Sequence, residues 1–109
     1  MHLKSTADDR EADLGAAGLL DRVVAVCAAH GATVGEVLGR SRVPRIVVAR
    51  HAAMAMIRGL RSEFTERTIY SYPEIGAMFG RDHTTVMNAV QVHRQRVADY
   101  QARHAETFD

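Results

Sequence analysis

The chain has 109 residues, of which 47% are apolar and 25% charged, the ordinary composition of one globular domain with one core. No apolar run approaches the length of a membrane span, and no N-terminal stretch resembles a signal peptide, so we expect a cytoplasmic protein without membrane contact. The single cysteine, Cys27, cannot form an internal disulfide and lies in the apolar run 23–29, which predicts a buried structural thiol.

Charge is distributed unevenly along the chain. From Arg40 to Arg96 there are ten arginines and four acids, a net charge of +6, whereas the rest of the chain carries −5. Such a block fits either a polyanion-binding face or a solvated surface that happens to be rich in arginine. Thirteen of the fourteen basic residues are arginine, whose planar fork matches phosphate and guanine edges, and this favours nucleic acid.

The first half of the chain predicts two helices. Residues 1–15 are polar without a clear period and predict a mobile tail, which leaves 16–109 as the folded domain. A helix is expected over 16–30, ended by Gly31, with an apolar side made of Leu19, Leu20, Val23, Val24 and Cys27. A short helix over 33–38 follows, where Thr33 and Glu36 have the spacing of a capping box.

A long helix is predicted over 44–64, with Pro44 in its first turn. Its inward stripe has the 4, 3, 4 spacing of a helix face and consists of Ile46, Arg50, Ala53, Ile57, Leu60 and Phe64. Arg50 is the one charged member of that stripe.

The second half of the chain predicts two helices joined by a tight turn. Ser71 and Glu74 form a second capping box with Pro73 in the first turn, which predicts a helix over 72–79 that ends at Gly80. The last helix is expected to follow Asp82 and run to about residue 103, with an inward stripe of Val86, Val90, His93, Val97 and Tyr100. This layout is that of a helix-turn-helix, a double-stranded DNA-binding motif.

The amino end of the last helix carries side chains suited to reading base edges in a major groove. Asp82 can accept from a cytosine amino group, Thr84 and Thr85 offer a methyl or a hydroxyl, His83 can donate, and Asn88 can pair with adenine. The alternative is that Asp82 simply caps the helix and that its neighbours are ordinary first-turn residues.

Several strings of the chain, spread from about Leu19 to Val97, resemble the C-terminal DNA-binding domain (domain IV) of the bacterial replication initiator DnaA. They are Val48-Ala49-Arg50, Met54-Ala55-Met56, Pro73-Glu74-Ile75-Gly76 and Arg81-Asp82-His83-Thr84-Thr85-Val86. The resemblance implies an all-α, five-helix, Trp-repressor-like fold and a monomer that binds an asymmetric DNA site.

The resemblance also implies roles for individual residues. Asp82, His83, Thr84 and Thr85 correspond to major-groove contacts, and Arg50 corresponds to an arginine that reaches the minor groove. Where the family usually has Pro-Arg-Gln, this chain has His51-Ala52-Ala53. We therefore expect other side chains to contact DNA phosphates, namely Arg42, Arg45, Arg58, Arg61 and Arg81.

Catalysis is not indicated. The family's initiators hydrolyse ATP in another domain, but the one lysine here, Lys4, cannot complete a phosphate-binding loop. No catalytic constellation, cofactor motif or metal-ligand spacing stands out. The sequence thus predicts a nucleoid-associated DNA binder that acts in transcription or replication, alone or with proteins of those processes. The alternative is a protein-interaction module that keeps the fold without DNA binding.

Overall fold

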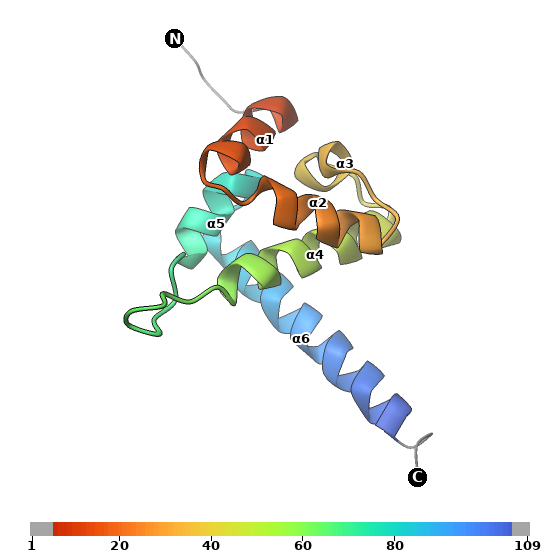
Figure 1. The fold of residues 1–109 in the computed structure, drawn as a ribbon. Coiled ribbons are helices and arrows are strands. Elements are labelled where there is room, and N and C mark those ends of the chain that lie inside the picture. The colour runs from red at the N-terminus through yellow and green to blue at the C-terminus, as the bar shows by residue number, and fades with distance from the viewer. Residues whose placement is uncertain (1–5, 106–109) are drawn as a thin grey trace.

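A computed structural model describes residues 6–105 and shows six helices in that range (Figure 1). The helices are α1 (Ala7–Ala16), α2 (Leu20–Ala29), α3 (Val34–Leu38), α4 (Pro44–Arg58), α5 (Tyr72–Phe79) and α6 (His83–Ala105). The described residues contain no strand, only an isolated antiparallel bridge between Arg61 and Thr68. The all-α prediction is confirmed, although the described part of the chain has one helix more than the five expected.

The additional helix is α1, so the prediction of a mobile tail over 1–15 is wrong from residue 7 onward, while residues 1–5 lie outside the described part. Thr6 and Asp9 form a capping box that starts α1. Leu14 is fully buried and Arg10 is 8% exposed. Two inward residues in ten make too weak an apolar period to indicate a helix, but the capping box was a readable signal. The chain turns at Gly18, so α2 starts at Leu20 and not at residue 16.

The predicted helix boundaries that rest on capping residues are confirmed. Thr33 and Glu36 exchange hydrogen bonds at the start of α3, and Ser71 and Glu74 do so at the start of α5. Pro44 occupies the first turn of α4. These signals were readable because each hydrogen-bonded pair lies within three residues along the chain.

Helix α4 ends at Arg58, so the expected extension to Phe64 is wrong. Gly59 terminates the helix, and the chain then folds back on itself through the Arg61–Thr68 bridge. Phe64 lies at the outer part of this loop and is 94% exposed. The helical spacing of Leu60 and Phe64 was therefore accidental.

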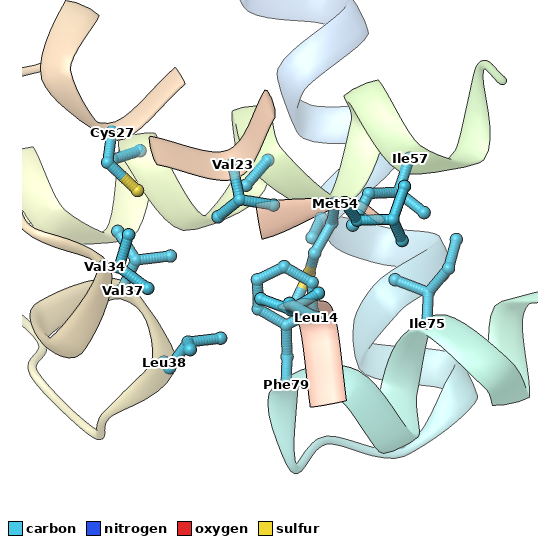
Figure 2. Packing of buried hydrophobic residues seen from close by; sticks show 14 of the residues in the cluster. Leu14, Val23, Cys27, Val34, Val37, Leu38, Met54, Ile57, Ile75 and Phe79 are labelled. Carbon is cyan, nitrogen blue, oxygen red and sulfur yellow. The ribbon is translucent and has the colours of Figure 1, made fainter. Parts of the chain in front are cut away.

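The core lies between α1, α2, α3, α4, α5 and the first half of α6. Figure 2 shows Leu14 and Phe79 between the α2–α3 side, with Cys27 and Val37, and the α4–α5 side, with Ile57 and Ile75. Cys27 is 1% exposed, as expected, and burial raises the pKa of its thiol.

Only the first part of α6 belongs to this core. Val86, Ala89 and Val90 are buried, whereas Val97 and Tyr100 are exposed and His93 is half-buried, which corrects the predicted inward stripe. Val24 of α2 is likewise 44% exposed. In Figure 1 the carboxyl half of α6 extends away from the other helices, so the stripe continues past the elements it could pack against.

Candidate nucleic-acid interface

The turn between α5 and α6 depends on two glycines. Gly80 has a left-handed backbone with φ of 67°, and the Arg81 amide donates to the Gly76 carbonyl at 2.8 Å. A Cβ at Gly76 would collide with the carbonyl oxygen of Arg81. The missing side chain lets α5 and the turn approach closely, which sets the direction in which α6 leaves.

Asp82 caps α6. The Thr85 amide donates to the Asp82 carboxylate at 2.8 Å, and this bond is the main reason that the pKa of Asp82 lies below its ordinary value. The side chain is exposed, so capping and a base contact do not exclude one another. A carboxylate held by the helix amino end is also fixed in orientation, as a reading side chain needs to be.

The predicted reading side chains share the exposed amino end of α6. His83, Thr84, Thr85 and Asn88 are all exposed, while Val86 on the opposite face is buried. Met87 is 45% exposed and lies three residues from Thr84, on the same helix face. The exposed face therefore offers an apolar side chain beside polar ones, as contact with a thymine methyl requires.

A polar pocket of about 320 Å³ lies next to this helix end, lined by Arg40, Ser41, Arg42, Arg50, Gly80 and Arg81. The guanidinium of Arg81 donates to the carbonyls of Phe79 at 2.7 Å and Gly39 at 2.9 Å. It thereby joins the α3–α4 connector to the helix-turn-helix. Burial, and then the nearby charges of Arg10 and Arg40, lower the pKa of Arg81. This concentration of positive charge suits a phosphate.

Arg50 is directed into the protein and is only 6% exposed. Its guanidinium donates to four backbone carbonyls at the end of α3 and in the connector: Val37 at 2.8 Å, Ser41 at 3.1 Å, Gly39 at 3.2 Å and Glu36 at 3.3 Å. Burial, followed by the charge of Arg81, lowers its pKa. In this geometry Arg50 braces the connector and does not present its guanidinium to a minor groove.

Arg10, which sequence reasoning did not single out, reaches the same region from α1. Its Nη1 donates to the Leu38 carbonyl at 2.7 Å, and its guanidinium occupies the space in front of Gly80. Helix α1 is thus fastened both to the end of α3 and to the turn. No local pattern could have indicated this contact, because it joins residues 28 positions apart.

Three of the predicted phosphate contacts hold other parts of the fold together. Arg45 donates to the Gly31 carbonyl, and Arg61 donates to Thr68 Oγ1 at 3.3 Å. Arg58 donates to the Tyr70 carbonyl at 3.0 Å and lies 4.0 Å from the centre of the Tyr72 ring. The structure brings Arg42 and Arg81 together beside α6, but not these three.

Residues 6–105 contain no group of three or more histidine, cysteine or acidic side chains placed to hold a metal ion. Over the same range, no helix is long and apolar enough to cross a membrane.

Comparison with known proteins gives a family match over residues 23–92, to the family described as bacterial dnaA protein helix-turn-helix. Among curated proteins, the chromosomal replication initiator protein DnaA of Deinococcus radiodurans is 46% identical over 65 residues, which are 60% of this chain and 12% of that protein. The same-named protein of Tropheryma whipplei is 36% identical over 73 residues, 67% of this chain and 13% of the relative. No solved structure matches.

These two matches span only about an eighth of each relative. The family match over residues 23–92 covers α3, α4, α5, the turn and the exposed start of α6. Since the family match covers well over half of the chain, the chain belongs to the bacterial DnaA helix-turn-helix family of DNA-binding domains.

Proposed function

We propose that this protein binds double-stranded DNA in a sequence-specific manner, with the amino end of α6 in the major groove. Asp82, His83, Thr84, Thr85 and Asn88 contact base edges, each with the chemistry derived from its side chain. The observation that carries the proposal is their exposure on one helix end directly beside a pocket lined by four arginines.

Phosphate contacts come first from the exposed side chains of that pocket, Arg40 and Arg42, and from Arg81. Arg45 and Arg61 are exposed as well, so their phosphate contacts stay predictions. Arg58 is half-buried over Tyr72, and Arg50 supports the surface from within.

The biological role that we propose is a transcriptional regulator or a modulator of replication without ATPase activity. The relatives are named chromosomal replication initiator proteins. This name supports recognition of DNA near sites where replication begins. Each copy reads one asymmetric site, in the company of replication or transcription proteins. The alternative of a fold kept only for protein contacts predicts no DNA binding at any salt concentration.

A salt titration of DNA binding tests the proposal. A labelled duplex pool, enriched by repeated selection from random sequence, is titrated by fluorescence anisotropy at about 50 mM and 200 mM salt. A binder that neutralises several phosphates loses roughly tenfold or more in affinity between those concentrations. It also prefers the selected duplex over a scrambled one. Absence of binding at both concentrations would contradict the proposal and favour the alternative.

A further inference from the structure

Arginines from three separate elements hold the carboxyl end of α3. Arg10 comes from α1, Arg50 from α4 and Arg81 from the turn before α6. Together they donate to the backbone carbonyls of residues 36–39 and 41. The last carbonyls of a helix have no partner within it, so these charged donors replace the water that would otherwise bind there. The path of the α3–α4 connector, residues 39–43, therefore depends on three guanidinium groups.

Arg10 also lies against the turn between α5 and α6. A Cβ at Gly80 would collide with Nη2, Cζ and Nε of Arg10, so the planar guanidinium fills the space that a side chain there would take. Burial, followed by the charge of Arg10, lowers the pKa of Arg81, which places the two guanidinium groups near one another. One side chain of α1 thus contacts both the end of α3 and the turn.

The two segments that Arg10 joins carry the side chains proposed to bind DNA. The connector presents Arg40 and Arg42 to solvent, and the turn leads directly into the exposed amino end of α6. Phosphate contacts set the register in which a protein meets the base edges. The connector and the turn must therefore be held at a fixed distance from each other if both are to match one duplex.

Helix α1 is firmly attached to the rest of the protein. It contacts α2, α3 and α5, and its Leu14 is fully buried in the common core. The Thr6–Asp9 capping box orders its first turn, next to Arg10. Arg10 itself is only 8% exposed, so it supports the turn from within the protein. The family match begins at residue 23, so the contacts of α1 lie outside the matched part of the chain.

From these contacts we infer that Arg10 is a positioning residue for DNA recognition, which holds the connector and the turn in one fixed arrangement. Without it, Arg40 and Arg42 still attract a duplex, but the amino end of α6 no longer meets the base edges in a single register. The inference rests on the proposed function and extends the DNA-binding unit to α1. Arg10 acts through the backbone of Leu38 and Gly80 and contacts neither phosphate nor base.

Methionine variants of the whole protein test this inference by fluorescence anisotropy on the selected and the scrambled duplex. Arg10→Met keeps the apolar stem but removes the guanidinium. We expect at least about fivefold weaker binding to the selected duplex and a smaller change on the scrambled one. The control Arg22→Met removes the same charge at an exposed arginine of α2 and should leave the ratio of the two affinities unchanged. A loss of stability alone lowers both affinities by the same factor, because it only reduces the concentration of folded protein, so the ratio reports positioning.

Arg10→Lys separates position from charge, and it also serves if methionine prevents folding. The ammonium keeps the charge but has no planar group to lie against Gly80. We therefore expect the affinity ratio to fall in this variant too, although by less than in Arg10→Met. Full recovery of the wild-type ratio by lysine would show that Arg10 acts through its charge and would overturn the inference.

Amide hydrogen exchange without DNA measures the positioning itself. The Arg81 amide, which donates to the Gly76 carbonyl in the turn, should exchange roughly tenfold faster in Arg10→Met, whereas that of Ala53 inside α4 should change less. If the wild type prefers neither duplex, the proposed function fails and this inference fails with it. If the wild type prefers the selected duplex, an unchanged affinity ratio in Arg10→Met, or equal changes at both amides, would overturn the inference alone.

Discussion

Replacing Arg50 by methionine distinguishes the brace seen in the structure from the minor-groove contact implied by the resemblance. Methionine keeps most of the apolar stem but removes every hydrogen-bond donor of the guanidinium. Four backbone carbonyls, those of Glu36, Val37, Gly39 and Ser41, then lose a charged donor.

The size of the effect follows from where these acceptors lie. The bond to the Val37 carbonyl is buried, so its loss leaves an acceptor without water and costs about 1–3 kcal/mol. The other three bonds are only partly buried, and water can replace them at a cost of about a few tenths of a kcal/mol each. Because burial disfavours the charge of Arg50, removing that charge recovers part of the lost stability. We expect a net loss of about 2–3 kcal/mol in the free energy of unfolding.

Thermal unfolding of the DNA-free protein, followed by circular dichroism, measures this directly. For a domain of this size, a loss of that magnitude lowers Tm by roughly 10–20 °C. Arg42→Met, at an exposed arginine of the same pocket, is the control and should change Tm by less than about 3 °C. If Arg50→Met unfolds at the wild-type temperature and only DNA affinity falls, the brace is wrong and Arg50 acts on DNA.

Three further predictions address the exposed amino end of α6, the arginine pocket beside it and the histidines. Thr84→Ala should cost about 1–3 kcal/mol on the selected duplex but little on scrambled DNA, measured by competition; equal losses on both would remove Thr84 from base readout. Arg42→Gln should weaken binding to every duplex and lower the slope of log affinity against log salt by about one, and an unchanged slope would show that Arg42 meets no phosphate. Burial lowers the pKa of His51, and so does the charge of Arg96, whose Nη1 lies 3.0 Å from His51 Nδ1. Burial and the charge of Arg96 also lower the pKa of His93. Because the unfolded chain then binds protons more readily than the folded one, stability should fall as pH drops through about 6.5, with a smaller fall in His51→Gln; a Tm independent of pH between about 7.5 and 5 would contradict this reasoning.

The elements that sequence reasoning predicted well are those defined by contacts between near neighbours. The capping pairs at Thr33 and Ser71, the left-handed Gly80 and the proline at the start of α4 each act within one turn. The exposure of the amino end of α6 was predictable for the same reason, since it follows from the polar first turn of that helix.

What could not be predicted depends on distant parts of the chain. The spacing of apolar residues shows which face of α6 is apolar. It does not show where along α6 the neighbouring helices end, so Val97 and Tyr100 were predicted to be buried although they are exposed. Arginine is read from sequence as a surface charge, yet Arg10 and Arg50 turn inward because the end of α3 offers carbonyls to them. The acceptors are backbone carbonyls, which every residue has, so residue types alone do not indicate which carbonyls an arginine will reach.

We propose that DNA lies against the amino end of α6 and the arginine pocket beside it. A titration of the ¹⁵N-labelled 12.0 kDa protein with its selected duplex, followed by amide chemical shifts, tests this directly. We expect the largest shifts in the turn and first turns of α6, residues 80–88, and in the connector 39–43. Shifts that gather instead on the loop 61–68 and the carboxyl half of α6, with residues 80–88 unchanged, would contradict this placement of DNA.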